Sequence, residues 1–478
     1  MDVLNKFKST LTSSVSSTVF STVSTIKDVL PGNPVTREYE INEHIASAGP
    51  GKSTCQTICS SQRIVIFQFL HYCSLFTVLF LTCFTLTRFS QLFSGLLWKV
   101  FSGVKKSTKQ SAAVFVLEKR SLEAKYPGHE RRHERDRILD QFKKSISQLT
   151  RLRHPQVLTV QFPLEESRDC LAFATEPVFA SLANLLGQHE NLPTPVPPAV
   201  RDYKMFDVEI KYGLLQLCEG LTFLHDSVKL LHRNLSPQSV VLNEAGAWKI
   251  FGFDFALNNS GLPNESPKWR CSSFVESCED LMPDLDFLAP EYSMEDDDLL
   301  SPASDMFSIG MLAFALHNSK PLFTNSSWST FRRNASELKS LRESNLQLIP
   351  TELKETLKLL LNSTPGLRPT ASECSKVHYF EDVGVKTLAN LDAQFQWDNL
   401  QKSQFYKGLP HVLPRLPQRV CVHRVVPCLA KEFVNPTMVP FVLPSVLAIA
   451  EEASAKDFVA FVLPQLKPVM KLTDPIQV

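Results

Sequence analysis

The sequence predicts a two-part protein, in which an α+β domain of two lobes precedes an all-α solenoid. Apolar runs that suit β-strands, among them SAAVFVLEK and CLAFATEPV, lie in the first part of the chain, and a long helical run, DVEIKYGLLQLCEGLTFLHDS, follows them. Towards the end an apolar-Leu-Pro unit recurs in VLPRL, FVLPSVL and FVLPQL, separated by segments of helical periodicity. This change of pattern along the chain indicates two structural units.

Length and composition set the broad class of the protein. A chain of 478 residues is too long for one ordinary domain. Its 50 Lys and Arg nearly balance its 49 Asp and Glu, so the net charge of +1 gives no indication of nucleic-acid binding. The 11 Cys have irregular spacings, which favour reduced thiols in the cytosol over a disulfide framework or a zinc site. Residues 1–30 contain no continuous apolar run of the kind found in a signal peptide.

The best-defined motif runs from His232 to Phe255 and reads HRNLSPQSVVLNEAGAWKIFGFDF. Protein kinases carry His-Arg-Asp, an Asn about five residues after that Asp, and Asp-Phe-Gly after a short hairpin. Here the catalytic Asp falls on Asn234, the metal-binding Asn on Ser239 and the metal-binding Asp on Gly252. An amide cannot act as a general base, and Gly has no side chain to bind a metal. The spacing therefore predicts a protein-kinase-like bilobal fold that has lost kinase catalysis.

Three further positions support this frame. Glu291 closes an Ala-Pro-Glu motif, where kinases end the activation segment. Asp305, in SDMFSIGML, fits the Asp of the following buried helix. Arg368 comes where a kinase places the Arg that pairs with this Glu. We therefore expect Glu291, Asp305 and Arg368 to have structural roles in the second lobe.

The groups that hold the ATP phosphates in a kinase are also substituted. In the Val-Ala-Ile-Lys register of SAAVFVLEK, the Lys position is Phe115. Lys119 is the nearest basic residue, but four positions along a strand separate it from Phe115 by roughly 13 Å. Ser145 occupies the position of the Glu that pairs with this Lys in a kinase. Both halves of the activating ion pair are therefore absent from the sequence.

The adenine end of an ATP pocket is better preserved in the sequence. CLAFATEPV ends in the hinge between the lobes, where Glu176 and Val178 offer backbone groups to an adenine, and Ala113 is a third candidate contact. Adenine binding at a hinge does not depend on the groups that hold phosphate. The sequence thus predicts no metal site and no required cofactor, and it allows weak ATP binding that is independent of Mg²⁺.

Two peripheral segments have more than one interpretation. Residues 1–34 are rich in Ser and Thr, and apolar residues recur every three or four positions over residues 1–30. This stripe predicts a helix that packs on the protein itself, a helix in peripheral contact with a membrane surface, or a disordered tail. The run HERRHERDR at 129–137 indicates either a solvated helix face or a patch for phosphoinositides or a partner.

A hydrophobic insert at 51–94 interrupts the expected first lobe. Its residues 64–87 carry no Asp, Glu, Lys or Arg and meet the length criterion for a transmembrane helix. A membrane span here would separate two strands that should pair. The alternatives are a retained intron, a membrane or hydrophobic insertion, and a folded core element. The intron is considered because Gly-Lys-Ser and the run rich in Phe, Leu, Ser and Cys resemble translated splice sites.

The Leu-Pro units that follow Asp392 are typical of HEAT-type helix pairs, in which Pro bends one helix of each pair. The alternative is a loose helical extension of the kinase-like lobe. The expected domains are the N-terminal segment 1–34, a kinase-like domain at 35–385 and the start of a HEAT-type solenoid at 392–478. Without a polar capping repeat, that solenoid is expected to be incomplete as given.

Several stretches of the sequence resemble one protein family. LTRLRHP, TEPVFASLANLLG, GAWKIFGFDF, NLQKSQFYKGLP and EFVNPTMVPFVLP are similar to the SCY-like pseudokinases, and most closely to their coated-vesicle-associated branch. The resemblance covers nearly the whole chain except the insert. It implies a cytoplasmic protein that is peripheral on Golgi, endosomal and clathrin-coated vesicle membranes. The partners that it implies are clathrin coat proteins, adaptor complexes, and SNARE or other trafficking proteins, without nucleic acid.

Two functions of different classes follow from this resemblance and from the residues. In the first, the chain is a pseudokinase scaffold or adaptor in clathrin-dependent traffic among the trans-Golgi network, endosomes and plasma membrane. In the second, it is a weak ATP-binding protein serine/threonine kinase that acts on coat adaptor subunits. Four of the five degenerate positions favour the scaffold most directly, and these are Phe115, Asn234, Ser239 and Gly252.

Overall fold

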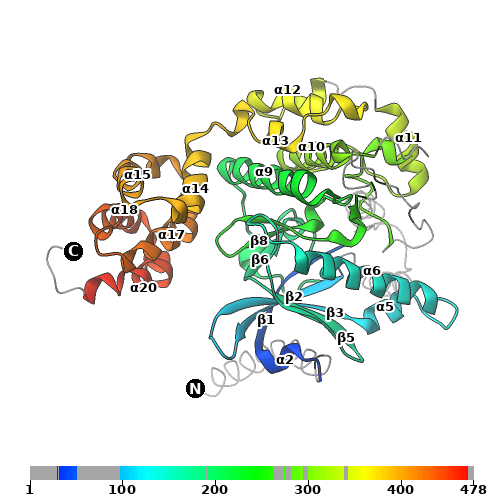
Figure 1. Cartoon of the computed structure of the whole chain (residues 1–478), viewed down its shortest axis with the longest axis horizontal. Coiled ribbons are helices and arrows are strands. Elements are labelled where there is room, and N and C mark those ends of the chain that lie inside the picture. The colour runs from blue at the N-terminus through cyan, green and yellow to red at the C-terminus, as the bar shows by residue number, and fades with distance from the viewer. Residues whose placement is uncertain are drawn as a thin grey trace, which may run out of the picture.

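The computed structural model describes most of the chain, as a small lobe around a β-sheet, a larger helical lobe and a further group of helices on the C-terminal side (Figure 1). The described residues are 30, 32–50, 97–189, 191–259, 261, 269, 274, 281–293, 300–338 and 343–471. The predictions for the helical stripe at 1–30, apart from Leu30, and for the insert at 51–94 lie outside the described residues.

A five-stranded antiparallel sheet forms the small lobe, with the strand order β1-β2-β3-β5-β4. Its strands are β1 (Tyr39–Ala48), β2 (Trp98–Lys105), β3 (Ser111–Glu118), β4 (Val160–Glu166) and β5 (Cys170–Thr175). β3 is buried on both faces, because its alternate side chains enter two apolar cores. The main core receives Ala113, Phe115 and Leu117. The smaller core, which also contains Val35 of α2 (Val35–Glu38), receives Ala112, Val114 and Val116.

β1 and β2 are direct neighbours in the sheet, although the insert at 51–94 separates them in the sequence. Tyr39 pairs with Lys105 at one end of this strand pair, and Ala48 pairs with Trp98 at the other. The chain therefore leaves the sheet and returns to it at adjacent positions. A short turn is enough to connect two antiparallel strands with this geometry.

Helix α6 (Arg132–Arg151) packs on the small lobe with one face. Its buried apolar side chains recur at helical spacing and are Ile138, Phe142, Ile146 and Leu149. The charged side chains of its first turns are largely exposed and include the ion pair between Arg132 and Asp136. This arrangement fits the interpretation of the run at 129–137 as a solvated helix face.

The larger lobe is mainly helical. Its longer helices are α9 (Asp207–Thr222), α10 (Pro302–Asn318), α11 (Trp328–Glu337) and α12 (Thr351–Leu360). The short helices of the two lobes are α5 (Lys119–Lys125), α7 (Leu182–Leu185), α8 (Pro198–Arg201) and α13 (Ala371–Cys374). Two small antiparallel sheets are β6 (Val178–Ser181), β8 (Val240–Asn243) and β9 (Trp248–Ile250), and β7 (Leu230–Leu231) with β10 (Leu257–Asn258). Their connecting loops carry the residues at the kinase catalytic positions.

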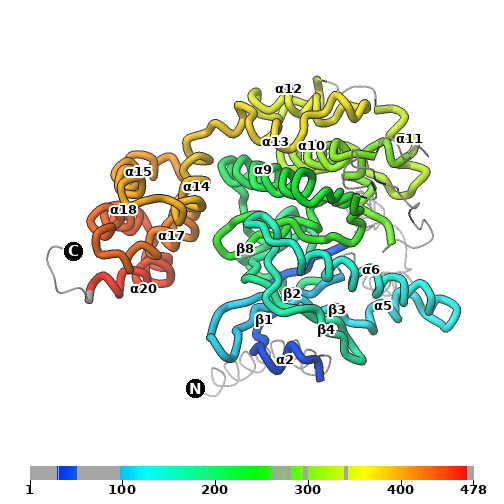
Figure 2. Tube along the Cα trace, in the orientation of Figure 1, coloured from blue at the N-terminus to red at the C-terminus, as the bar shows by residue number. Residues whose placement is uncertain are grey.

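The C-terminal helices form a group with a core of its own (Figure 2). They are α14 (Val383–Ala393), α15 (Asn399–Val412), α16 (Gln418–Val420), α17 (Val426–Ala430), α18 (Val439–Glu452), α19 (Ala455–Asp457) and α20 (Leu463–Leu466). Pro410 lies inside α15 and Pro444 inside α18, and π-helical turns come shortly before Pro427 and Pro464. Because proline has no N–H to donate, the helical hydrogen-bond pattern changes at these residues.

Helix α14 connects the two parts of the molecule. It spans the interval between the two predicted domains, and its Val385, Leu388 and Leu391 belong to the core of the C-terminal helices. Tyr212 of α9 belongs to the same core, so the C-terminal helices pack directly on the kinase-like domain. None of the helices in the described part of the chain combines the length and the apolar character needed to cross a membrane.

Candidate functional site

The loop at 232–239 takes the place of the kinase catalytic loop, and Asp305 of α10 holds it in position. The Asp305 carboxylate accepts hydrogen bonds of 2.8 Å from the backbone N–H groups of His232 and Arg233. It also lies 2.9 Å from Nε2 of His225. Burial by itself would raise the pKa of Asp305, but the hydrogen bond from His225 and its charge hold that pKa below its usual value. Asp305 therefore anchors the loop, which is the structural role expected from the sequence.

Glu291 and Arg368 form a bidentate ion pair in the larger lobe. The two terminal nitrogens of Arg368 donate to the two oxygens of Glu291, at 2.8 and 2.9 Å. Ser304 donates a further hydrogen bond of 2.6 Å to Glu291, and the Arg368 guanidinium lies 5.0 Å from the ring centre of Phe307. The Arg368 and Glu291 side chains are 0% and 1% exposed, so the predicted pair is present and inaccessible to solvent.

Asn234 lies at the position of the catalytic base, and its side chain serves as a structural link. Its Oδ1 accepts a hydrogen bond of 2.9 Å from the backbone N–H of Asp284. A neutral amide has no basic nitrogen or ionised oxygen that could take a proton from a substrate hydroxyl. Asn234 thus connects the loop to the segment before Glu291 and supplies no base.

The two metal-ligand positions lie against each other, and neither carries a carboxylate. Ser239 Oγ donates to the carbonyl of Ser236 at 3.0 Å and accepts from the N–H of Ser236 at 2.9 Å. Gly252 has a φ of +74°, and a Cβ placed on it would lie 2.9 Å from Cβ of Ser239. A carboxylate side chain at position 252 would therefore be strained and would collide with Ser239. Among the described residues, no group of three or more His, Cys, Asp or Glu is arranged to hold a metal ion.

Asp254 follows Gly252 by two positions and lies against α6. Its two side-chain oxygens are inaccessible to solvent, and neither has a hydrogen bond of ordinary geometry to another described residue. Burial raises the pKa of Asp254 to about 7, while the nearby Ser145 hydroxyl acts to lower it. Ser145 is the position at which a kinase carries the Glu of its activating ion pair. Asp254, the acid displaced from the metal-binding position, therefore lies beside Ser145, where the Glu of a kinase is missing.

An aromatic cluster fills the position of the phosphate-binding Lys. The Phe115 ring stacks on Phe173 with 4.8 Å between ring centres, and it lies 5.2 Å from the ring of Phe251. Trp98 packs edge-on against Phe173 at 5.1 Å. Phe115 is fully buried in this cluster. Lys119 begins α5 and bonds a carboxylate of β4 at 2.6 Å, so it does not replace the missing Lys.

The hinge backbone is partly engaged within the protein. Oγ1 of Thr175 donates a hydrogen bond of 2.8 Å to the carbonyl of Glu176, and the Glu176 side chain accepts from a neighbouring backbone N–H at 3.0 Å. Val178 begins β6 and pairs with β8, and Ala113 is completely buried in β3. A carbonyl oxygen has two lone pairs, so Glu176 retains acceptor capacity for an adenine amino group.

A hydrogen-bonded bridge between the lobes was not predicted from the sequence. The Gly49 N–H donates to the carbonyl of Gln238 at 3.2 Å. The Ser47 N–H donates to Oδ1 of Asn184, and Nδ2 of Asn184 donates to Oγ of Ser47, both at 3.0 Å. Gln188 accepts from the Asn184 side chain at 2.9 Å and from the Gln238 side chain at 3.1 Å. We call these five residues the interlobe bridge, because they tie the glycine turn after β1 to the catalytic-loop position.

The interlobe bridge lies where a kinase covers ATP with its glycine-rich turn. Its Ser47, Asn184 and Gln238 side chains are buried. None of these residues belongs to a motif, because Ser, Asn and Gln occur in many local contexts. The one local signal was Gly49, whose φ of +89° suits glycine and brings Trp98 close to its backbone.

Proteins with similar sequences share this domain type. The protein kinase domain model matches residues 87–380, which is more than half of the chain. SCY1-like protein 2 of Homo sapiens is 47% identical over 481 residues, which cover 100% of this chain and 45% of the human protein. The chain thus spans about half the length of this curated relative.

More distant relatives are also named for a kinase domain. The protein kinase domain-containing protein ppk32 of Schizosaccharomyces pombe is 28% identical over 383 residues, which cover 78% of this chain and 50% of that protein. The probable inactive serine/threonine-protein kinase scy1 of Dictyostelium discoideum is 24% identical over 379 residues, which cover 77% of this chain and 39% of that protein. With the predicted kinase fold confirmed by the domain match and the reactive positions substituted, this chain belongs to the protein kinase family and, within it, to the SCY-like pseudokinases.

Proposed function

We propose that this chain is a catalytically degenerate, protein-kinase-like scaffold or adaptor in clathrin-dependent vesicle traffic among the trans-Golgi network, endosomes and plasma membrane. The observation that supports this proposal most is that the residues at the kinase catalytic positions make structural contacts. Asn234 carries a structural hydrogen bond, Gly252 packs against Ser239, and Phe115 lies in an aromatic cluster. Phosphoryl transfer depends on charged groups at these positions, so the domain retains its shape without that chemistry.

The C-terminal helices support a docking role. We propose that they begin a HEAT-type solenoid, because α15 and α18 contain a proline and α17 and α20 have one near their start. These helices also pack as neighbours, α15 with α18 and α17 with α20. Stacked helix pairs of this type present extended surfaces to partners. The proposed partners are clathrin coat proteins, adaptor complexes, and SNARE or other trafficking proteins. The proposed location is cytoplasmic, on the surface of Golgi, endosomal and clathrin-coated vesicle membranes.

The docking part of this proposal is tested with the purified full chain and purified clathrin coats or adaptor complexes. We expect saturable binding in a co-sedimentation assay, with the same affinity in the presence and absence of ATP. The Asn234→Ala protein should bind equally well, because the proposed function does not use catalysis. A failure to bind coats and adaptors would contradict the trafficking role without changing the geometry of the degenerate cleft.

The competing function is a weak serine/threonine kinase that acts on coat adaptor subunits. Loss of a general base costs about 10²- to 10⁴-fold in rate, and loss of an electrostatic stabiliser costs about 10²- to 10³-fold. Two such losses take a kinase turnover of about 1–100 s⁻¹ to below roughly 10⁻² s⁻¹. A radiolabelled transfer assay on an adaptor subunit measures this rate. Stoichiometric phosphorylation that is abolished by Asn234→Ala would replace the scaffold with the enzyme.

We propose that no cofactor is required and that any ATP binding is weak and independent of Mg²⁺. Gly252 and Ser239 supply no carboxylate for the cation, and the interlobe bridge has to open before a nucleotide can enter from the glycine turn. The free energy of that opening lowers the apparent affinity. Titration of ATP with and without Mg²⁺ should give the same weak affinity, whereas tight binding that needs Mg²⁺ would contradict this proposal.

Residues 1–30 are proposed to supply a peripheral membrane contact. Their apolar stripe on a Ser/Thr-rich background suits membranes with packing defects better than membranes with high charge. Flotation of the full chain with small, highly curved vesicles should exceed flotation with large ones. The chain that lacks residues 1–34 should not float, and equal behaviour of the two chains would remove the membrane contact.

A further inference from the structure

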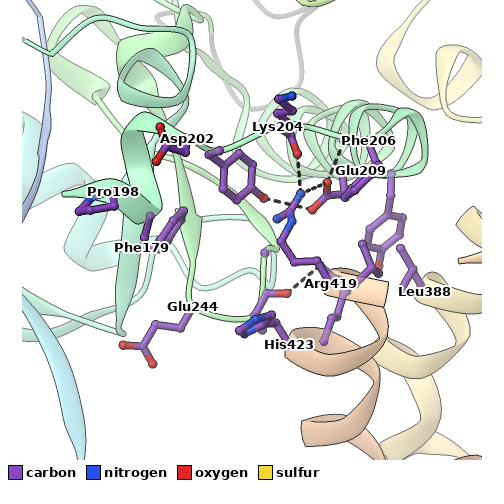
Figure 3. A pocket seen from close by; sticks show the side chains of 17 residues that line it. Phe179, Pro198, Asp202, Lys204, Phe206, Glu209, Glu244, Leu388, Arg419 and His423 are labelled. Atoms are coloured by element: carbon purple, nitrogen blue, oxygen red, sulfur yellow. Dashed lines mark hydrogen bonds and ion pairs between the residues drawn. The ribbon is translucent and has the colours of Figure 1, made fainter. Parts of the chain in front are cut away.

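A cavity of about 480 Å³ lies where the C-terminal helices meet the kinase-like domain (Figure 3). The kinase-like domain contributes the segment around α8, the start of α9 and the turn between β8 and β9, and the C-terminal helices contribute α14 and the region of α16. The site therefore exists only when the two units are packed together. Cavities of this size at domain junctions commonly bind small molecules or short peptides.

Arg419 forms one wall of the cavity and is held from several sides. It donates to the carbonyl of Lys204 at 2.8 Å and to Oε2 of Glu209 at 2.5 Å, and its guanidinium lies 4.0 Å from the ring centre of Tyr203. The Tyr203 hydroxyl donates to the other Glu209 oxygen at 3.1 Å. These groups pair with one another, so the wall is preformed and offers an aromatic face (Figure 3).

A second arginine fixes the junction beside the cavity. Arg424 donates to Oδ2 of Asp392 at 2.7 Å, and its guanidinium lies 4.7 Å from the ring centre of Tyr212. The Tyr212 hydroxyl donates to the same Asp392 oxygen at 2.7 Å. Two arginines of the C-terminal helices thus contact the α9 side of the kinase-like domain, which makes the cavity a fixed feature.

The apolar lining consists mainly of flat rings. The rings of Phe179 and Tyr203 lie 5.4 Å apart, Phe206 is 40% exposed, and Pro198 lies beside Phe179 in Figure 3. Rigid aromatic faces of this kind bind proline rings well, because both surfaces are flat and lose little conformational freedom. An exposed Phe beside such a surface is typical of a binding site for an apolar ligand.

The polar groups of the cavity further restrict which ligands fit it. His423 lines it and offers a ring nitrogen as a hydrogen-bond donor, whereas Lys204 contributes its backbone carbonyl, which Arg419 already binds (Figure 3). A proline residue brings a carbonyl acceptor and no N–H, so it satisfies the donor of His423 without burying a donor of its own. Glu244 also lines the cavity, and its carboxylate has no ion pair with any described residue. A basic side chain on the ligand would give this carboxylate a partner.

We propose that the junction cavity binds a short proline-rich peptide that carries a basic side chain, with the prolines against Phe179, Tyr203 and Phe206 and the basic group at Glu244. The site is separate from the degenerate kinase cleft and provides a specific docking point for a partner. Its ligand class follows from the aromatic lining, the donor of His423 and the unpaired carboxylate of Glu244, and it does not depend on the proposed trafficking role.

The experiment is a fluorescence anisotropy titration of the full chain with three labelled peptides, APPLPPRA, APPLPPEA and ASSLSSRA. We expect saturable binding of the first, with at least about tenfold weaker binding of each of the others. Phe206→Ala should weaken the first peptide about tenfold, because a central aromatic contact is removed. Glu244→Gln should weaken it about threefold and should reduce the preference for Arg over Glu in the peptide.

Two variants serve as matched controls. Leu186→Ala changes a side chain of similar exposure (38%) that does not line the cavity, and Glu451→Gln changes an exposed acid elsewhere. Both should bind the first peptide like the unaltered chain. The proposal is overturned if no peptide binds saturably up to 1 mM, if the acidic peptide binds best, or if the cavity variants behave like the controls.

Discussion

The anchoring groups of the larger lobe and the cleft next to them contain buried residues of opposite character. The carboxylates of Asp305 and Glu291 each meet several donors, so their buried charges are compensated. In the cleft, the positions that carry charge in a kinase hold an aromatic cluster around Phe115 and the contact between Gly252 and Ser239. The two regions meet at the loop 232–239, which the carboxylate of Asp305 holds in position.

This difference separates two requirements that an active kinase meets in one domain. The fold needs a few buried charges whose partners are built into the protein. Catalysis needs charged groups whose partners are the substrate and the metal. When neither is bound, such groups destabilise the protein. The larger lobe of this chain has the first set, and its cleft lacks the second. Variants of the anchoring groups and variants of the cleft can therefore be measured separately.

The largest expected effect comes from the anchoring pair. Arg368→Ala leaves Glu291 buried without its cation, so the free energy of unfolding should fall by about 3–5 kcal/mol. Chemical denaturation followed by circular dichroism measures this change. Lys358→Ala removes a cation that pairs with exposed Glu355 and Glu343, and it should cost much less, because solvent already screens these charges. Similar losses for the two variants would show that burial of the ion pair is unimportant.

Asp254 in the cleft should give a pH-dependent effect. Its pKa rises from 3.8 in the unfolded chain to about 7 in the folded protein. Ionisation therefore weakens folding as the pH rises from about 4 to 7, and the whole loss remains at higher pH. Asp254→Asn stays neutral, so it should raise the free energy of unfolding by up to about 4 kcal/mol above pH 7 and change it little at pH 4.

Thermal unfolding at pH 5 and pH 8 measures this prediction. The stability difference between Asp254→Asn and the unaltered chain should be larger at pH 8. Asp136→Asn, at an exposed acid on α6, should change the stability at pH 8 much less than Asp254→Asn does. A difference for Asp254→Asn that is equal at the two pH values would contradict the buried, protonated carboxyl.

Restoring a carboxylate to the metal position should destabilise the cleft. Gly252→Asp puts a side chain on a backbone with a φ of +74° and brings its Cβ within 2.9 Å of Ser239, so we expect a loss of about 1–3 kcal/mol. ATP binding should remain independent of Mg²⁺. Gly366→Asp adds the same side chain at a glycine with open space around it and should have little effect. Tight Mg²⁺-dependent ATP binding by Gly252→Asp would mean that the cleft still forms a metal site.

The smallest expected effect comes from removing the insert. Deletion of residues 51–94 joins Pro50 to Gly95, and the pairing of Ala48 with Trp98 allows a short turn to close the strand pair. We expect soluble expression and melting temperature to be equal or higher, because an apolar run is lost. Unfolding of the shortened chain would show that the insert is part of the core.

The residue identities at the kinase motif positions could be read from the sequence without a structure. The identity of the residue at a motif position decides whether a base or a metal ligand exists, and packing cannot convert Asn234 or Gly252 into a carboxylate. Local patterns also placed much of the secondary structure. The strands expected in SAAVFVLEK and CLAFATEPV are β3 and β5, and the long helix expected after them is α9. These predictions succeed because strand and helix patterns repeat over neighbouring residues.

Contacts between residues from distant parts of the chain depend on the tertiary structure. Asp254 lies beside Ser145, Gly49 bonds Gln238 across the lobes, and Arg419 reaches Glu209 from the C-terminal helices. Each of these residues has a partner that lies far away in the sequence. Their local sequences are ordinary, apart from the turn at Gly49. A buried polar group needs a partner, but the packing of whole elements decides which one comes within hydrogen-bond distance.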